Sequence, residues 1–599
     1  MQNLNKIFKE LESCPKEQLG ANLDKLRESV DSIFKTQQHN FTKLNQIGTA
    51  LSAESNLNVL LELIVTAAME FTNADGGTLY RTSDDDKHLK FEILRTASLN
   101  FKMGGTTGIE CPFYPIKLFP DGKPNHEQVA AYVAITGETV NIPDVYEVSG
   151  FDFQGTKGFD QKTGYRSTSM LVIPLKNHEN EIIGVLQLLN AQDKENEIIS
   201  FSKETQKIIE SLASQAAIAL TNTQLIKGLS DLLEAFIQVI AGAIDEKSPY
   251  TGGHIRRVAE VTLMIAEAIH KTKEGRFAKV KFSPENMHEL KVAGWLHDIG
   301  KITTPEYVVD KATKLETIYD RVHTVVTRFE ILKRDVKIES LEKKAELLAE
   351  GKSNEAQVLE AELQSKISEI EDDCNFIKQV NVGGEFLSDD KIERINSIAT
   401  KYKVTVDGEN QNFLSENEVY NLSIRKGTLT PEERNVINHH IVVTIDMLES
   451  LPYPKKLRNV PEFAGGHHET LIGTGYPKGL TEDELSLEAK IMAVADIFEA
   501  LTAQDRPYKD GKKMSEAMRI LGFFVKDKHI DGDILKAFVE SGYCAEYAKN
   551  ELHPNQLDTF EFEGKTYDYT VYKEHAQKCF EEKQKQIEQR LKEKTVTTY

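Results

Sequence analysis

Seven histidine and aspartate residues in the second half of the chain have the types and spacing to build a metal centre. They are His254, His297, Asp298, His440, His467, His468 and Asp496. Imidazole and carboxylate groups together form a ligand set that divalent transition metals accept. Metal ions held in this way can clamp a phosphodiester and activate water. The chemistry that these residues predict is therefore metal-assisted hydrolysis.

Short, dense motifs surround these residues. The chain reads HIRRV from His254, HDIGK from His297, HHE from His467, GTGYP from Gly473, ADIFEAL from Ala495 and RPY from Arg506. Together these motifs resemble the HD-GYP family, metal-dependent phosphodiesterases of cyclic dinucleotides. The resemblance implies an all-α catalytic domain that hydrolyses cyclic di-GMP to pGpG or GMP at a two-metal site.

The resemblance also implies which residue binds which metal. Asp298 would bridge two ions, with His254, His297 and Asp496 on one ion and His440, His467 and His468 on the other. The family spacing from an acidic pair selects His440 over the adjacent His439. Iron or manganese is the metal that the family implies. Some members bind a third metal through an acidic residue four positions before the first histidine, but Tyr250 stands there and favours two.

Basic residues near the metal motifs are candidates for holding the phosphates of a substrate. They are Lys301, Arg257, Lys311, Arg506 and Lys509. Lys301 lies one helical turn beyond Asp298, and we expect these two to act in catalysis, with the ammonium stabilising charge that develops on phosphate oxygens.

The GTGYP turn is a second candidate for substrate contact. Gly475 suits a tight turn and Tyr476 could touch a base or a phosphate. The family usually has Asp before this turn, where this chain has Ile472. Either a supporting hydrogen bond is lost and activity falls, or the loop packs differently and the substrate preference shifts.

Composition limits the partners and the compartment. The net charge of −21, from 94 acidic and 73 basic residues among 599, argues against a DNA or RNA partner. The five cysteines are scattered, odd in number and without CxxC spacing, which fits a reducing compartment. We find neither a signal-peptide core nor a stretch apolar enough to span a membrane, so we expect a cytoplasmic protein.

The pattern of apolar residues predicts a multidomain chain. We expect an amphipathic helix at 1–45, an α+β sensor domain at 46–225, a connecting helix at 226–248 and an all-α domain at 249–599. A charge-rich segment, 315–428, interrupts the last domain, and within it 330–350 and 355–373 predict a helical hairpin. Strands are predicted at 76–80 and 91–94, and β-hairpins at 169–190 and 559–572.

The α+β segment is similar to GAF domains in its closing strand and last helix. Many GAF domains that bind cyclic nucleotides carry an N-K-F-D-E set, of which this chain keeps Asn190 and Phe201. Ala191, Thr205 and Gln206 replace the other three. These replacements weigh against cyclic-nucleotide binding, and a different, unknown small ligand or a purely dimerising role is at least as well supported.

The helix expected between the domains shows a heptad pattern. Its 4-3 positions are Leu212, Ala216, Ala219, Thr223, Ile226, Ser230, Leu233, Ile237, Ile240 and Ile244. This seam predicts a homodimer through the N-terminal and connecting helices, and the alternative is an ordinary buried helix.

Two other functions of the chain also stay open. One is a phosphodiesterase that prefers cyclic GMP-AMP, and the other is a non-catalytic receptor for a cyclic dinucleotide or a protein, with 315–428 as its interaction surface.

Overall fold

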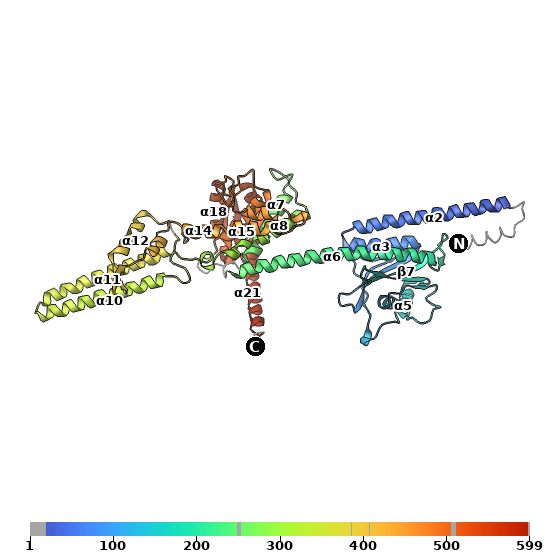
Figure 1. Ribbon diagram of the computed structural model, residues 1–599, viewed down its shortest axis with the longest axis horizontal. Helices are drawn as coiled ribbons and strands as arrows, with labels where there is room; N and C mark the ends of the chain where they lie inside the picture. The colour runs from blue at the N-terminus through green and yellow to red at the C-terminus, as the bar shows by residue number, and fades with distance from the viewer. Residues whose placement is uncertain (1–18, 248–252, 385, 407, 505–510, 597–599) are drawn as a thin grey trace. The chain divides into compact units, whose positions relative to one another are not determined.

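The computed structural model describes residues 19–247, 253–384, 386–406, 408–504 and 511–596. The chain divides into two compact units, Met1–Leu232 and Leu233–Tyr599 (Figure 1). The first unit is α+β and the second is largely helical, which confirms the predicted fold class. No described helix is long and apolar enough to cross a membrane.

An antiparallel sheet forms the centre of the first unit. Its strands are β1 Ala74–Thr82, β2 His88–Thr96, β3 Phe101–Gly104, β4 Ile116–Lys117, β5 Val140–Ile142, β6 Met170–Lys176, β7 Ile182–Gln192 and β8 Ile198–Ile199. They follow the order β3-β2-β1-β7-β6-β5, with β4 on β2 and β8 on β7. The pairing of β6 with β7 confirms the predicted hairpin.

Helices cover this sheet because both of its faces are apolar. The helices of the unit are α2 Leu19–Ala53, α3 Leu57–Thr72, α4 Val129–Thr136, α5 Gln154–Thr163 and the first part of α6 Lys203–Lys247. Side chains alternate across a strand. Leu79 accordingly packs in one core with α3 and α6, and Tyr80 packs in another with α4. Of the predicted N-terminal helix, α2 includes residues 19–45, and residues 1–18 lie outside the described part.

The second unit consists mainly of helices that pack around one large hydrophobic core. They are α7 His254–Lys271, α8 Pro284–Leu296, α9 Glu306–Val309, α14 Pro431–Asn438, α15 His440–Glu449, α16 Val460–Gly465, α17 Leu487–Thr502, α18 Met514–Lys526, α19 Gly532–Glu540, α20 Tyr543–Glu551 and α21 Lys573–Val596. The strands β11 Thr559–Phe562 and β12 Lys565–Asp568 form the predicted second hairpin. α7 packs against α8, α17 and α19, which brings distant motifs together.

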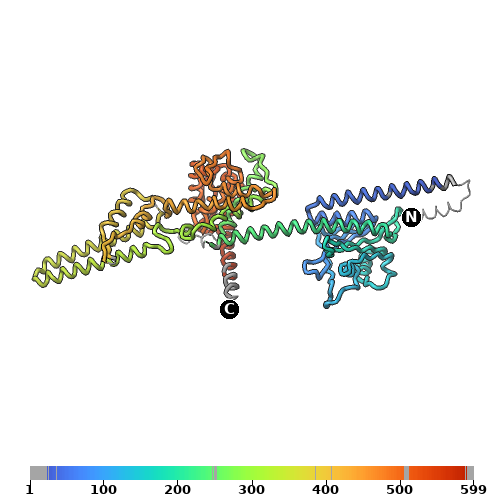
Figure 2. Tube along the Cα trace, in the orientation of Figure 1, coloured from blue at the N-terminus to red at the C-terminus, as the bar shows by residue number. Residues whose placement is uncertain are grey.

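The segment 315–428 folds around its own core. Figure 2 shows α10 Val322–Ala349 and α11 Ser353–Asn381 side by side, which confirms the predicted helical hairpin. The segment also contains α12 Asp389–Lys401, β9 Lys403–Val406, β10 Glu409–Asn412 and α13 Glu416–Leu422, which the sequence did not predict. Phe329, Ile377 and Phe413 lie in a hydrophobic core separate from that of the surrounding domain.

The heptad seam predicted on α6 is buried inside the chain at its two ends, while Ile226, Leu233 and Ile240 in its middle are exposed. Leu212 and Ala216 are buried in the core of the first unit, while Ile237 and Ile244 are buried in that of the second. As a seam between two molecules the prediction is wrong at these positions, because the cores of each unit already cover them. A second exposed row lies beside the middle of that seam, at Ile218, Leu225, Leu229, Leu232, Phe236 and Val239.

Candidate metal centre

All seven predicted metal ligands meet at one place in the second unit. Three of them stand at helix starts or inside a helix: His254 begins α7, His440 begins α15, and Asp496 lies within α17. His297 caps the end of α8, and Asp298 precedes the short 3₁₀ helix η4 Ile299–Thr303. His467 and His468 follow α16 after its C-cap residue, Gly466. Helix ends therefore aim most of these side chains at a common point.

Asp298 is the carboxylate that the two groups of imidazoles share. Its Oδ2 lies 3.2 Å from Nε2 of His297 and 3.5 Å from Nε2 of His254. Its Oδ1 lies 3.2 Å from Nε2 of His440. Ligand atoms within 4.8 Å of one another form two groups, Asp298 with His440, His467 and His468, and Asp298 with His254 and His297.

Asp496 approaches the second of these groups. Its Oδ1 lies 3.4 Å from Nε2 of His254 and 3.9 Å from Nε2 of His297. The arrangement therefore matches a divided ligand set in which one carboxylate bridges.

Backbone carbonyls orient three of the imidazoles. Nδ1 of His297 contacts the carbonyl oxygen of Gly294 at 2.8 Å, and Nδ1 of His467 contacts that of Ala464 at 2.6 Å. Nδ1 of His440 contacts the carbonyl of Ile437 in the same way. Each contact fixes the ring so that Nε2 points into the site.

Buried ligand atoms without hydrogen-bond partners are the strongest sign that this site binds a cation. In the described chain, Nε2 of His297, His440 and His467 and Oδ1 of Asp298 are buried and make no hydrogen bond. Buried polar atoms without partners are rare because each costs free energy. Divalent ions held by the two ligand groups would satisfy these four atoms, so the residues fit the metal centre that the sequence predicts.

The protonation states of the site residues also favour the binding of a metal cation. Burial would raise the pKa of Asp298, but Lys301 and His297 hold it well below its usual range. Burial, with the neighbouring His468 and His297, holds the pKa of His467 well below its ordinary value, and burial lowers that of His468 to about 4. Ionised carboxylates and neutral imidazoles are the forms that bind metals.

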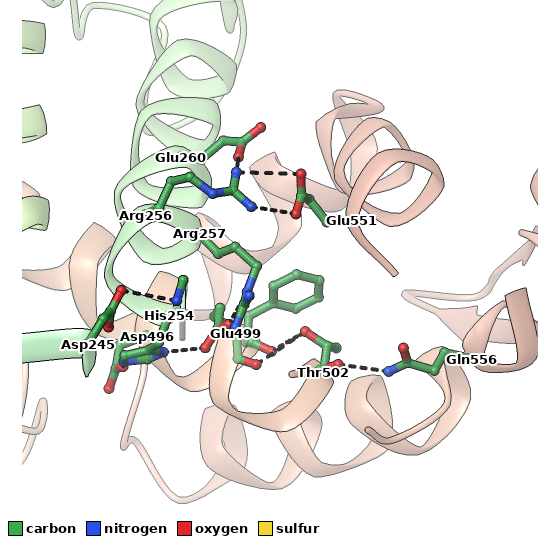
Figure 3. A network of polar contacts seen from close by, with 12 residues as sticks. Asp245, His254, Arg256, Arg257, Glu260, Asp496, Glu499, Thr502, Glu551 and Gln556 are labelled. Carbon is green, nitrogen blue, oxygen red and sulfur yellow. Dashed lines mark hydrogen bonds and ion pairs between the residues drawn. The ribbon is translucent and has the colours of Figure 1, made fainter. Parts of the chain in front are cut away.

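Glu499 and Arg257 lie behind His254, on the side away from the other ligands (Figure 3). A carboxylate oxygen of Glu499 contacts Nδ1 of His254, and the other accepts a hydrogen bond of 2.5 Å from Nε of Arg257. Burial would lower the pKa of His254, but Glu499, with Asp298 and Asp496, raises it well above its ordinary value. The predicted phosphate contact of Arg257 is therefore corrected, because its guanidinium is bonded to Glu499.

Of the other predicted phosphate-binding residues, the structure places Lys301 at the site. Its Nζ lies 2.5 Å from Oδ2 of Asp298. Lys311 is a second correction: its side chain is fully buried, with Nζ 2.8 Å from Oε2 of Glu433 and 3.0 Å from Oδ1 of Asn421. That ion pair withdraws it from any substrate. Arg506 and Lys509, like Tyr250, lie outside the described residues.

The predicted GTGYP turn lies against the metal ligands. The ring of Tyr476 stacks on His468 with centroids 4.8 Å apart. A methyl group on Gly475 would come within 2.6 Å of the backbone of His468 and Thr470, so this position has no room for a side chain. Ile472 is 56% exposed and its backbone pairs with Thr481.

Two glutamates of the site, Glu469 and Glu499, lie within the sequence motifs but were not predicted to act there. Glu499 stands three residues after Asp496, which is the spacing that puts both on one face of a helix. Glu469, after the double histidine, accepts hydrogen bonds from the backbone N–H groups of Lys478, Gly479 and Leu480 and so folds the loop. For Glu499, the helical spacing was the signal that could have found it.

The first unit holds a separate cavity of about 350 Å³. Its walls include the aromatic rings of Tyr80, Phe91, Phe153 and Phe159 and the polar side chains of Thr78 and Gln187. Arg95 is the lining cation among the described residues, and its guanidinium lies 2.9 Å from Glu62. The cavity is thus mostly apolar, with its cation already paired.

Family comparisons agree with this division of the chain. A model of the GAF domain matches residues 56–220, and two models of the HD domain match residues 251–371 and 417–534. The gap between the two HD matches falls within the inserted segment. The chain therefore matches a GAF domain in its first half and an HD domain in its second half, and the motifs of the HD part resemble those of the HD-GYP family.

Relatives of known function match a limited part of the chain. A "Cyclic di-GMP phosphodiesterase" of Thermotoga maritima is 35% identical over 20% of this chain and 31% of its own length. "Cyclic di-GMP phosphodiesterase PA4108" of Pseudomonas aeruginosa is also 35% identical over 20% of this chain, and 27% of its own length is covered. "3'3'-cGAMP-specific phosphodiesterase 1" of Vibrio cholerae is 40% identical over 14% of this chain and 19% of its own length. The chain thus spans less than a third of each of these relatives.

Proposed function

We propose that this chain is a metal-dependent phosphodiesterase that hydrolyses a cyclic dinucleotide, and that cyclic di-GMP is its preferred substrate. The observation that carries the proposal is the pair of ligand groups that meet at Asp298, where buried Nε2 atoms lack hydrogen-bond partners among the described residues. The names of the relatives support the substrate class.

Two divalent ions, iron or manganese, would be held by the ligand groups that share Asp298, with Asp496 beside His254. When bound, such ions polarise phosphate oxygens and lower the pKa of water. The ammonium of Lys301, beside Asp298, would stabilise negative charge that develops on a phosphate placed there. Tyr476, held flat on His468, would present its ring to a nucleobase.

The double variant His297→Ala with Asp298→Ala tests the site, because it removes one ligand and the shared carboxylate. We expect it to lose hydrolysis of cyclic di-GMP and metal content together, measured by chromatography of the products and by elemental analysis. Retained hydrolysis would refute the proposed site.

The adjacent histidines on either side of the α14–α15 boundary offer a matched pair of variants. His440→Ala should lose metal and activity, while His439→Ala should keep both, because His439 is exposed and His440 is buried. Cyclic GMP-AMP is assayed alongside, since a relative is named for that substrate. A metal-loaded protein that hydrolyses neither dinucleotide would favour the receptor function.

For the GAF domain we propose a sensor role with a neutral small ligand. The support is its cavity of about 350 Å³, whose lining cation Arg95 is paired with Glu62, which leaves no free positive charge among the described lining residues for a phosphate. Equilibrium dialysis with cyclic AMP and cyclic GMP should therefore show no binding to the full chain, and saturable binding of either would contradict this proposal.

We also propose a homodimer formed along the exposed row of α6. Ile218, Leu225, Leu232 and Val239 repeat every seven residues, with Leu229 and Phe236 between them, and Leu229 and Val239 are each 69% exposed. Beside this row, Leu233 and Ile240 on one flank would face the small Gly228 and Ala235 of a parallel second copy. Large side chains then meet small ones along this part of the seam, which supports the parallel arrangement.

Two neighbouring substitutions separate this seam from the one predicted from the sequence. Leu229→Asp should convert the dimer to a monomer in light scattering, because it places a charge in the exposed row. Ser230→Asp, at a position of the predicted seam, should leave the dimer intact. Dissociation by Ser230→Asp alone would support the seam predicted from the sequence.

For the compartment we propose the cytoplasm, which the unpaired state of Cys111, Cys374, Cys544 and Cys579 supports.

A further inference from the structure

The last turn of α6 lies against two of the metal-ligand motifs. Asp245 Oδ2 accepts a hydrogen bond of 3.0 Å from the backbone N–H of Gly253, the residue directly before His254. Lys247, the final residue of α6, donates from Nζ to the backbone carbonyls of Lys301 at 3.1 Å and Thr304 at 2.7 Å, and also to that of Ile302. One helical turn thus contacts the approaches to both His254 and Asp298.

The carbonyls bound by Lys247 belong to the end of η4. Carbonyls at the end of a helix keep acceptor sites that the helix does not fill, and a lysine ammonium occupies these sites while also complementing the negative partial charge of the carbonyls. η4 carries Lys301, whose own ammonium lies 2.5 Å from the shared carboxylate of Asp298. Lys247 therefore fixes the backbone from which Lys301 reaches the site.

The end of α6 and the metal-ligand residues also line one small cavity together. Ile244, Asp245 and Lys247 line it together with His254, Asp298 and Lys301. Figure 3 shows Asp245 beside His254, which comes from a different helix. The end of α6 is therefore part of the wall around the metal ligands.

The same end of this helix is anchored in the core of the domain. Ile237, Ala241 and Ile244 are buried with residues of α7, α8 and α17. Toward the GAF domain, α6 continues without interruption to Lys203. Because a helix is stiff along its axis, a shift or rotation applied to it arrives at Asp245 and Lys247, and packed elements respond by moving between discrete arrangements.

We propose that Asp245 and Lys247 are positioning residues through which α6 sets the geometry of the catalytic turn. Lys247 would hold η4 so that Lys301 faces Asp298, and Asp245 would hold the start of α7 so that His254 faces the same carboxylate. This inference rests on the proposed phosphodiesterase function and adds a route for its regulation, in which displacement of α6 loosens both contacts.

The main test compares Lys247→Met with Lys247→Arg in the full-length, metal-loaded chain. Lys247→Met removes the donors but keeps an apolar stem of similar length, so we expect kcat for cyclic di-GMP to fall about tenfold or more. KM and metal content should stay within about twofold, because neither Lys301 nor a metal ligand is removed. Lys247→Arg should restore most of kcat, since a guanidinium also donates to carbonyls.

Lys227→Met on the same helix is the matched control. Lys227 is exposed and lies off the proposed dimer seam, so this variant should match the unsubstituted chain. Asp245→Asn, which keeps the size of the side chain, should lower kcat in the same direction. Unchanged kcat in Lys247→Met would overturn the proposal. A loss of kcat, metal and thermal stability together, without rescue by Lys247→Arg, would overturn it too, because it would show a merely structural role.

Hydrogen exchange separates failure of this inference from failure of the proposed function. The amides of Lys301 and Thr304 are bonded within the turn that Lys247 holds. We expect their exchange to be faster in Lys247→Met than in Lys227→Met, whether or not the chain hydrolyses any dinucleotide. Faster exchange without turnover in the unsubstituted chain would refute the phosphodiesterase and keep the positioning role, while unchanged exchange would refute the positioning role alone.

Discussion

Glu499 contacts Nδ1 of His254 on the side of the imidazole that faces away from the metal ligands. Nε2 of the same ring points the other way and lies 3.4 Å from Oδ1 of Asp496, one turn earlier on α17. A single helix therefore supplies a carboxylate to each nitrogen of one histidine. Such a partner behind a metal-binding histidine fixes the orientation of the ring and raises its basicity.

The variant Glu499→Gln should weaken metal binding. Loss of the charge leaves Arg257 without its anionic partner in a buried place and removes the carboxylate that orients His254. We expect the affinity for the metal to fall about 10- to 100-fold, measured by titration of metal into the chelated protein. Asp483→Asn, an exposed position in the same unit, should leave the affinity unchanged. An equal affinity in Glu499→Gln and the unsubstituted chain would mean that His254 is oriented by other contacts.

A methyl group at Gly475 should disturb the turn that carries Tyr476. The new Cβ would lie 2.4 Å from Cα of Glu469 and 2.6 Å from the backbone of His468, and backbone atoms cannot move aside easily. We expect Gly475→Ala to cost about 1–3 kcal/mol of stability and to displace the ring of Tyr476. Denaturant unfolding and activity assays would show both effects.

Gly522→Ala is the control for that substitution. It lies in α18 with no atom within 4 Å of the new methyl group, so it should be neutral or stabilise the helix by up to about 1 kcal/mol. If Gly475→Ala were as stable and as active as Gly522→Ala, the packing argument for the turn would be wrong.

The metal ligands could be predicted from the sequence because each lies in a local motif whose residue types already specify the chemistry. The buried ion pair of Lys311 could not be predicted, because its partner Glu433 is 122 residues away and only the fold shows that the two meet. A basic residue near a phosphate site in sequence is therefore weak evidence of contact. The predicted phosphate contact of Arg257 failed for a related reason, because its partner Glu499 lies on α17, far away in the sequence.

The heptad on α6 shows a second limit of sequence reasoning. Periodicity reveals that a helix has an apolar face, but not whether that face is covered by the same chain. Ile237 and Ile244 fit the predicted seam and are buried in the chain's own core, whereas Leu229, outside that seam, is exposed. The inserted segment is similar, because its hairpin helices were visible as charged periodic runs while the short, polar β9 and β10 carried no strand pattern.

Lys314 should make the stability of the inserted segment depend on pH. Its Nζ is buried and donates to the carbonyl of Leu422 at 2.9 Å. Burial, reinforced by Lys391, lowers its pKa from 10.5 to about 8. Because the folded pKa lies below the unfolded one, Lys314 binds more protons in the unfolded chain between pH 8 and pH 10.5, so its contribution to stability rises with pH across this window.

The corresponding measurement is the hydrogen exchange of α10 and α11, corrected for intrinsic rates, at the two ends of that pH window. Protection should increase toward high pH in the unsubstituted chain and should become flatter in Lys314→Met, which cannot titrate. Lys337→Met, exposed on α10, should keep the full dependence. A slope that survives in Lys314→Met would assign the titration to another group.

The core of the inserted segment should unfold independently of the metal centre. Phe329 is fully buried, with its ring centroid 4.5 Å from that of Phe413, and both belong to a core distinct from the one around α7 and α17. Phe329→Ala should therefore cost about 3–5 kcal/mol within the segment. We expect faster hydrogen exchange and proteolysis in α10 and α11 while metal content stays unchanged.

Ile338→Ala provides the comparison on the same helix. Ile338 is 54% exposed, so its truncation should change the stability of the segment by less than about 0.5 kcal/mol. If Phe329→Ala also removed the metal, the two cores would be coupled, and the ion pair of Lys311 with Glu433 would be the first contact to examine. That pair links the residues just before the segment to α14, which leads directly into His440. Metal retained in Phe329→Ala but lost in Lys311→Met would show that the coupling runs through this ion pair and not through the hydrophobic core of the segment.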